Sequence, residues 1–369
     1  MKQITTSTMN VATAQDSQPD VTVGLDVSDR KCQVCVLDAA GEVLLSGVVA
    51  LTETALTVQF KALEHARIVF EVGSHSRWLS TLFEDMGHEV IVANARQLAL
   101  ISQNNRKSDK ADAELLARLG RMDIKLLRPV AHRSATAQAG LAIVRSRAGT
   151  VRCRTLLINS IRGQVKAAGS RIPDCDARYF HDRCGAIPDA LKPALLPLVA
   201  MIKQLSKTIE DYDNKLEKDA DTIAPGARRL TTIPGVGILT AISFTLVIDD
   251  VKRFASSRAV GPYLGLVPRR SQSGEIDKAM RISKAGDPYT RQLLVQCAQW
   301  GLRKDAKDSE LHTWGLKLAG TSKVDKRRAT IAVARKLAVL MHRMLVTGKD
   351  YDPNYEAKRR EKAAAKKAA

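Results

Sequence analysis

Two aspartates three residues apart, Asp109 and Asp112, are the first residues in this sequence whose spacing suggests chemistry. They lie in Ser-Asp-Lys-Ala-Asp-Ala-Glu, residues 108–114, at the start of an Ala/Leu-rich segment. On a helix, residues three apart share one face, where like charges destabilise the helix by about 0.2–0.5 kcal/mol. A divalent cation such as Mg²⁺ relieves this repulsion and keeps coordination positions for phosphate oxygens. The alternative is a solvated acidic helix start, which the helix dipole favours.

Two further acids lie at the ends of apolar strand patterns. Asp26 lies in Val-Gly-Leu-Asp-Val-Ser, and Glu71 ends Ile-Val-Phe-Glu. A charge in such a place is costly unless it is paired or bound to a metal. If the first and fourth strands are neighbours, both carboxylates emerge at one edge of the sheet, and the helix carrying Asp109 and Asp112 can cover that edge. The four acids therefore predict a site for Mg²⁺ (or Mn²⁺).

The elements that must position these acids follow from hydrophobic periodicity. Residues 21–27, 32–37 and 42–49 read as a strand meander, followed by a helix at 53–65, a strand at 67–72, a helix at 76–86, a strand at 89–93 and helices from Ala95 onward. Three strands followed by alternating helices and strands are the order of an RNase H-like α/β domain, here residues 21–125. Residues 1–20 are polar, and we expect a disordered leader.

The six cysteines do not suggest a metal site. Cys32 and Cys35 form a Cys-x-x-Cys on a predicted strand, where residues three apart point to opposite faces. No second pair and no matching histidines complete a zinc site. We therefore expect reduced structural thiols, which leaves the acids as the candidate ligands.

Charge indicates the class of partner. The 369 residues include 58 Lys and Arg against 39 Asp and Glu, a net charge of +19. Such an excess favours a polyanion, and nucleic acid is the leading candidate. A membrane surface is the rival, but no apolar run approaches the roughly 20 residues that span a bilayer, and the N-terminus lacks a signal-peptide core. We expect a cytoplasmic protein.

Residues 126–224 predict a coiled-coil helical domain. The two seams contain Leu141, Val144, Ala148, Val151, Thr155, Ile158, Arg162 and Val165, and then Leu191, Leu195, Leu198, Ile202, Leu205, Ile209, Tyr212 and Leu216. The simplest arrangement is an antiparallel pair, whose second helix Pro193 and Pro197 should delay or kink. The first seam is flanked by arginines seven residues apart: Arg145, Arg147, Arg152 and Arg154. They suggest contacts with a nucleic-acid backbone. A solvated basic face and oligomerisation through the seam stay open.

Residues 225–348 predict a mainly helical C-terminal domain. A glycine-containing hairpin at residues 234–237 between two apolar helices resembles a helix-hairpin-helix motif, in which Gly235 and Gly237 let backbone amides approach a phosphate. Plain helix packing is the alternative. Helices at 288–303, 309–318 and 326–346 close the domain, and residues 349–369 form a basic tail.

A polar, arginine-flanked segment lies between these elements. Ser273 precedes Gly274 in Val-Pro-Arg-Arg-Ser-Gln-Ser-Gly, followed by Arg-Ile-Ser-Lys-Ala-Gly-Asp. A serine beside glycine is usually part of a turn. It is equally a candidate nucleophile, with Arg269, Arg270 and Lys284 placed to neutralise a phosphate.

From about residue 21 to 348, the chain resembles the DEDD-type insertion-sequence transposases, also called the IS one-ten family, relatives of the Piv DNA invertase. Asp26, Glu71, Asp109 and Asp112 match the family's four acids, and Ser273 falls at its nucleophile position. The resemblance implies a RuvC-like domain holding Mg²⁺, a coiled-coil linker and a C-terminal transposase domain.

The resemblance also implies partners and a mechanism. In this family the protein acts as an oligomer, a dimer or tetramer, in which the serine attacks DNA while the acids of another protomer complete the site. A structured noncoding RNA from the element pairs with donor and target DNA. The resulting hypothesis is site-specific recombination through a phosphoserine intermediate. Two alternatives are a RuvC-like metal-dependent nuclease that uses water, and a non-catalytic nucleic-acid scaffold.

Overall fold

The computed structural model describes residues 19–94, 108–273, 276–355 and 358. The chain forms two compact units, Met1–His132 and Arg133–Ala369, which are described separately. The predicted leader lies outside the described residues except for Pro19 and Asp20, and so do the helix predicted from Ala95 and most of the predicted basic tail. None of the described helices is long and apolar enough to cross a membrane.

The N-terminal unit is built on a mixed five-stranded sheet of order β3-β2-β1-β4-β5. Its strands are β1 (Val21–Val27), β2 (Lys31–Leu37), β3 (Val43–Ala50), β4 (Ala66–Glu71) and β5 (Glu89–Ala93). β2 pairs antiparallel with both β1 and β3, and β4 pairs parallel with both β1 and β5. The expected neighbourhood of the first and fourth strands is therefore confirmed.

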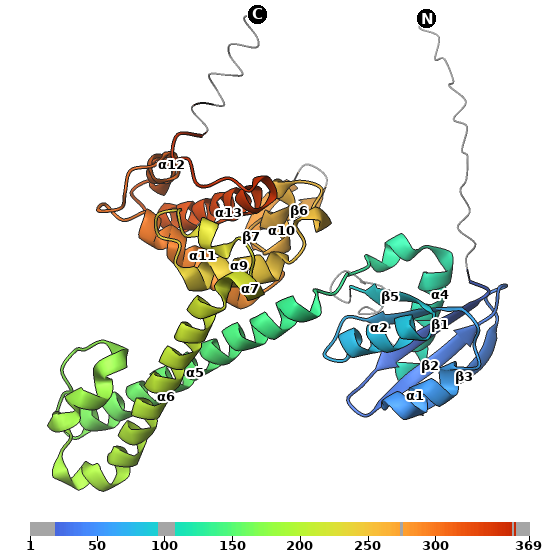
Figure 1. The fold of residues 1–369 in the computed structure, drawn as a ribbon, viewed down its shortest axis with the longest axis horizontal. Helices are drawn as coiled ribbons and strands as arrows, with labels where there is room; N and C mark the ends of the chain where they lie inside the picture. The colour runs from blue at the N-terminus through green and yellow to red at the C-terminus, as the bar shows by residue number, and fades with distance from the viewer. Residues whose placement is uncertain (1–18, 95–107, 274–275, 356–357, 359–369) are drawn as a thin grey trace, which may run out of the picture. The chain divides into compact units, whose positions relative to one another are not determined.

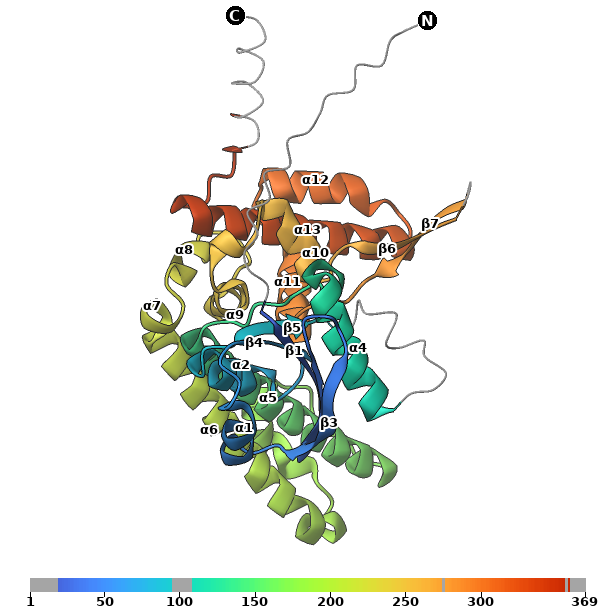
Figure 2. The same cartoon turned by 90° about the vertical axis from the view of Figure 1, so that its right-hand side faces the viewer.

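Helices cover both faces of this sheet (Figure 2). On one face, α1 (Glu53–Phe60) and α2 (Ser76–Asp85) bury Phe60 and Phe83 against Leu25 and Phe70. On the other face lies α4 (Asp109–Met122), which is followed by the short helix η2 (Ile124–Leu127). The predicted helix at residues 53–65 is too long, because the chain already turns after Phe60 to enter β4, and neither Gly nor Pro marks that turn in the sequence.

The C-terminal unit contains a long antiparallel helix pair, α5 (Ala135–Ala167) and α6 (Lys192–Lys218), joined by the short helices η3 (Ala177–Ala186) and η4 (Asp189–Leu191) (Figure 1). Arg147 on α5 donates to Asp213 on α6. Arg154, seven residues later on α5, donates to Ser206, seven residues earlier on α6, which confirms the antiparallel direction. Pro193 lies in the first turn of α6, where its missing N–H is tolerated, and Pro197 lies inside the helix.

The seam of this pair departs from the predicted heptad. Thr155 is exposed, and Ile161 is buried in place of Arg162, because a straight helix drifts from a 3.5-residue repeat. On α6 the buried positions Val199 and Ser206 each lie one residue beyond the predicted leucines. Near the tip, Ile158, Val165, Phe180, Leu195 and Ile202 form a separate small core.

The main core of this unit joins the helix pair to the C-terminal helices. Its remaining elements are α7 (Ala220–Ile223), α8 (Ala227–Leu230), α9 (Ile238–Ile248), η5 (Val251–Arg253), η6 (Ser257–Ala259), α10 (Val260–Tyr263), β6 (Pro268–Ser273), β7 (Ile276–Ile282), α11 (Pro288–Gly301), α12 (Glu310–Ala319) and α13 (Lys323–Thr347). Leu141 and Val144 of α5 pack in one cluster with Phe244, Leu294 and Met341. The coiled coil and the C-terminal domain, expected as 126–224 and 225–348, thus belong to one unit that begins at Arg133.

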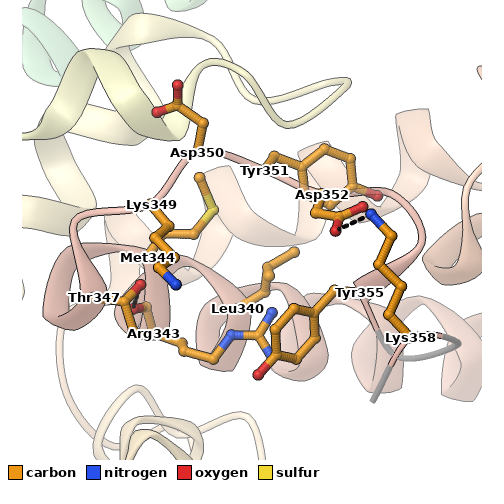
Figure 3. A pocket seen from close by; sticks show the side chains of 10 residues that line it. All are labelled: Leu340, Arg343, Met344, Thr347, Lys349, Asp350, Tyr351, Asp352, Tyr355 and Lys358. Atoms are coloured by element: carbon orange, nitrogen blue, oxygen red, sulfur yellow. Dashed lines mark hydrogen bonds and ion pairs between the residues drawn. The ribbon is translucent and has the colours of Figure 1, made fainter. Parts of the chain in front are cut away.

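The chain beyond α13 packs on the domain as far as it is described. The Arg343 guanidinium lies 3.6 Å from the centre of the Tyr355 ring, and Lys358 pairs with Asp352 at 2.9 Å (Figure 3). The Tyr351 amide also donates to the Thr232 hydroxyl. The segment expected to start a basic tail at residue 349 is therefore part of the folded surface up to Tyr355.

Candidate active site

The ends of β1 and β4 bring two of the predicted acids to one edge. The last registered pair of these parallel strands is Leu25 with Phe70, so Asp26 and Glu71 are the next residue on each strand. Leu25 and Phe70 point into the core beneath α1 and α2. Since side chains alternate along a strand, Asp26 and Glu71 belong to the opposite face, the one that α4 covers. Both acids are partly exposed.

Glycine allows α4 to approach this face closely. A Cβ at Gly24 would lie 2.0 Å from the Ala113 carbonyl oxygen and 2.6 Å from the Ala117 nitrogen. One turn further along the helix, a Cβ at Gly120 would lie 2.5 Å from a Val69 methyl group. The N-terminal end of α4 therefore points along β1 toward Asp26.

Asp112 is the buried member of the acid pair. Ser108 caps α4 by accepting a hydrogen bond from the Ala111 amide at 3.2 Å, and Asp112 follows in the first turn, next to Ala113. Asp112 is only 6% exposed, and its buried Oδ1 atom has no hydrogen-bond partner among the described residues. An oxygen in that state is costly, which is not expected of a solvated helix start.

Asp109 lies in the same turn but is exposed. Its position fits the helix-dipole alternative as well as a metal site. Within the described ranges, no group of three or more His, Cys, Asp or Glu side chains is close enough to hold a metal ion. The structure thus brings Asp26, Glu71 and Asp112 to one edge of the sheet without closing them into a metal cage.

The donor set nevertheless fits a hard divalent cation. Carboxylate oxygens on two strand ends and one helix are the ligands that Mg²⁺ and Mn²⁺ prefer. The orphaned Oδ1 of Asp112 has coordination capacity that no described protein group uses. The residues that would hold the ion are Asp26, Glu71, Asp112 and, at the rim, Asp109.

The Cys-x-x-Cys behaves as expected from its strand position. Cys32 lies in the core beneath α1 and α2, whereas Cys35 packs with Ala113 and Ala117 of α4, so the two thiols point to opposite faces. Burial, together with the Asp26 carboxylate, raises the pKa of Cys32 to about 11. Burial also raises the pKa of Cys35, assisted by Glu114.

Ser273 lies at the tip of a β-hairpin rather than in an irregular loop. It ends β6 and pairs with Ile276, the first residue of β7. Arg269 and Arg270 precede it on β6 and are exposed, and Lys284, just after β7, has a left-handed backbone with φ of 54°. The polar sequence concealed these strands, because it lacks the apolar alternation by which strands are recognised.

Comparison with known proteins decides the family. A DEDD-type family model with the description "Transposase" matches residues 23–169, and the model "Transposase IS116/IS110/IS902 family" matches residues 227–313. The chain is 27% identical to the transposase for insertion sequence element IS1111A of Coxiella burnetii, covering 91% of this chain and 92% of the relative. It is 28% identical to the transposase for IS1328 of Yersinia enterocolitica, covering 80% and 89%.

The chain belongs to the DEDD-type insertion-sequence transposases. A putative transposase of Sinorhizobium fredii is also similar, with 28% identity over 90% of this chain and 85% of the relative. The protein is therefore a DNA transposase, and its DEDD domain implies an RNase H-like fold.

The arginines predicted to bind nucleic acid have different surroundings in this transposase. Arg145 pairs with Asp287 at 3.1 Å, and Asp287 caps α11 by accepting from the Thr290 amide. Burial raises the pKa of Asp287, but the Thr290 and Arg145 hydrogen bonds outweigh it and hold the pKa below its ordinary value. Arg147 is bound by Asp213, whereas Arg152 is exposed. Arg152 keeps the greater freedom to meet a phosphate.

The predicted glycine hairpin is present between α8 and α9. Gly235 has a φ of +84°, and Gly237 precedes the first residue of α9. A Cβ at Gly235 would lie 2.3 Å from the Trp300 ring. Sequence reasoning overlooked Trp300, whose only signal was an aromatic residue near the end of a predicted helix.

Proposed function

We propose that this transposase carries out site-specific DNA recombination with a serine nucleophile and a metal-binding acid site. The observation that carries the proposal is the buried, unpartnered oxygen of Asp112, which α4 places over the sheet face and edge to which Asp26 and Glu71 belong. A protein that needed these acids only for folding gains nothing from burying such an oxygen.

The four acids have distinct parts in this proposal. Asp26, Glu71 and Asp112 bind the cation from the sheet edge and the helix, and Asp109 closes the site from its exposed position. A Mg²⁺ or Mn²⁺ ion held by these residues would supply Lewis-acid polarisation of the scissile phosphate and charge stabilisation for the leaving 3′ oxygen.

Ser273 supplies the nucleophile. Its hydroxyl oxygen forms a bond to phosphorus, the bond from phosphorus to the 3′ oxygen breaks, and the hydroxyl proton balances the departing 3′ oxygen. The phosphoserine conserves the phosphoester bond, so the exchanged strands can be rejoined by the reverse step without ATP. Arg269, Arg270 and Lys284 neutralise phosphate charge during both steps.

The remaining proposals concern partners. An RNA encoded by the element guides the choice of donor and target DNA, and the protein acts as a homo-oligomer in which one protomer's acids serve another protomer's serine. The net charge of +19 supports extensive contact with nucleic acid.

Covalent trapping tests the nucleophile. Purified protein with Mg²⁺, the copurifying RNA and both DNAs is denatured during turnover, and we expect a protein-DNA adduct whose modified residue is Ser273. The Ser273→Ala protein should form no adduct, while Ser271→Ala, two residues earlier on the same strand, should form it normally. Strand cleavage without any adduct would favour the nuclease that uses water. An unchanged transposition rate for Asp112→Asn would favour the scaffold.

A further inference from the structure

A groove in the C-terminal unit lies beside the glycine hairpin and has no part in the proposed chemistry. It has a volume of about 550 Å³ and is lined by the hairpin, α9 and α11. The lining residues used below are Gly235, Gly237, Gln296, Trp300 and Lys307.

Trp300 is the feature that makes this groove unusual. It lies near the end of α11, and the hairpin backbone rests against one part of its ring, as the 2.3 Å approach of a Gly235 Cβ shows. Only glycine fits at that point, where φ is also +84°. The indole is nevertheless 39% exposed. The hairpin thus holds a large aromatic surface in a fixed position and leaves part of it open to solvent.

The electrostatics of the groove select a negatively charged ligand. None of the described residues that line it carries a carboxylate, and Lys307 supplies a positive charge. The grooves beside α13 differ, because Asp350, Asp352 or Glu310 lines each of them. A partly exposed indole in a groove that also contains a lysine and the amide side chain of Gln296 is a combination that suits an unpaired nucleotide.

We infer that this groove binds one unpaired nucleotide of a single-stranded nucleic acid, with the base stacked on Trp300 and its phosphate near Lys307 and the hairpin. The inference rests on the proposed function in that it requires a single-stranded segment, from RNA or from opened DNA, during the reaction. Paired bases are excluded, since a duplex does not present the face of a base to a side chain.

A protein with a single tryptophan reports this contact directly. The chain has three tryptophans, and the Trp78→Phe and Trp314→Phe substitutions leave Trp300 alone. We expect single-stranded oligonucleotides to quench its fluorescence and a duplex of the same length to leave it unchanged. Parallel titrations with single-stranded RNA and single-stranded DNA identify which source binds more tightly.

Substitutions in the full-length wild-type background separate stacking from charge. Trp300→Ala should weaken single-strand binding about 5- to 100-fold, and Trp300→Phe should retain most of it. A plot of the logarithm of the binding constant against the logarithm of the salt concentration has a slope that reports phosphate contacts. Lys307→Gln should make this slope less steep by about 0.7, whereas Trp300→Ala should leave it unchanged. Trp314→Phe, whose ring contacts Lys336 rather than the groove, is the matched control.

The outcomes distinguish this site from the catalytic proposal. The inference is overturned if neither single-stranded RNA nor single-stranded DNA quenches the Trp300 fluorescence. It is also overturned if the duplex quenches the fluorescence as strongly as the single strands. Wild-type binding by a Trp300→Ala protein that melts at the wild-type temperature overturns it as well. None of these measurements requires strand transfer, so the groove can fail while the Ser273 adduct forms. Conversely, quenching without any adduct supports the groove and rejects the nucleophile.

Discussion

At the level of single residues, Asp112 separates a metal site from an acidic helix start. No described group hydrogen-bonds its buried Oδ1, so the metal-free protein buries a carboxylate oxygen at a cost. We expect Asp112→Asn to raise the free energy of unfolding of the metal-free protein by about 1 kcal/mol. The wild-type protein should instead gain about 2–3 kcal/mol from Mg²⁺ at about 100 times its dissociation constant.

Thermal melts with EDTA and with Mg²⁺ measure both effects. Asp85→Asn removes an exposed carboxylate at the end of α2 and should respond to Mg²⁺ like the wild-type protein. Equal stabilisation of wild-type and Asp112→Asn proteins by Mg²⁺ would show that Asp112 does not bind the ion.

The thiols offer a second test at this level. Burial and the neighbouring Asp26 raise the pKa of Cys32 to about 11, so at pH 8 only about one molecule in a thousand carries the Cys32 thiolate. Cys153 is exposed on α5. Alkylation of the native protein at pH 8, followed by peptide mass spectrometry, should modify Cys153 long before Cys32. Modification of both at similar rates would contradict the buried, structural role assigned to Cys32.

At the level of elements, the packing of α4 on β1 determines where the acids lie. In Gly24→Ala the new Cβ would meet backbone atoms of Ala113 and Ala117, which cannot move aside as a side chain would. We expect the free energy of unfolding, measured in urea, to fall by about 1–3 kcal/mol. Transposition should also be lost, because a displaced α4 carries Asp109 and Asp112 away from the strand ends.

Gly47→Ala is the matched control for this substitution. Gly47 lies on β3 of the same sheet, and a Cβ there would meet no atom within 4 Å. It should therefore keep both stability and activity. If Gly24→Ala is as stable and active as Gly47→Ala, α4 does not need its close approach to β1.

Elements with strong periodicity were predictable from the sequence, and those without it were not. The bounds of β1 and β5 were predicted correctly, because each is a short apolar run between polar turns. The hairpin of β6 and β7 was missed, since Pro-Arg-Arg-Ser-Gln-Ser carries no apolar alternation. The end of α1 at Phe60 was also missed, because only the return of the chain into β4 determines it.

The same division applies to the candidate site. Strand ends and helix spacing were enough to place Asp26, Glu71 and Asp112 at one edge of the sheet. The burial of Asp112 and the exposure of Asp109 were not predictable, because they depend on how α4 is seated against Gly24. Sequence likewise did not indicate that Asp287, 142 residues further along the chain, pairs with Arg145.

For the whole molecule, the acids and the serine belong to different compact units, Met1–His132 and Arg133–Ala369. This division makes the composite-site proposal testable by mixing two inactive proteins. Asp112→Asn retains Ser273, and Ser273→Ala retains all four acids. If one protomer's acids serve another protomer's serine, coexpression of the two proteins creates mixed oligomers that contain one complete site. If each protomer uses its own acids, every site in a mixed oligomer lacks one essential group.

We therefore expect coexpression to restore adduct formation, which neither protein shows alone. Tags of different size identify the chain that becomes attached to DNA, and it should be the Asp112→Asn chain, since only that chain retains the serine. As a control, the Ser273→Ala protein is coexpressed with a protein that carries both substitutions. This pair should form no adduct, because neither chain has a serine at position 273. Failure of the complementary pair to form an adduct, despite copurification of both tagged chains, would place each serine with the acids of its own protomer.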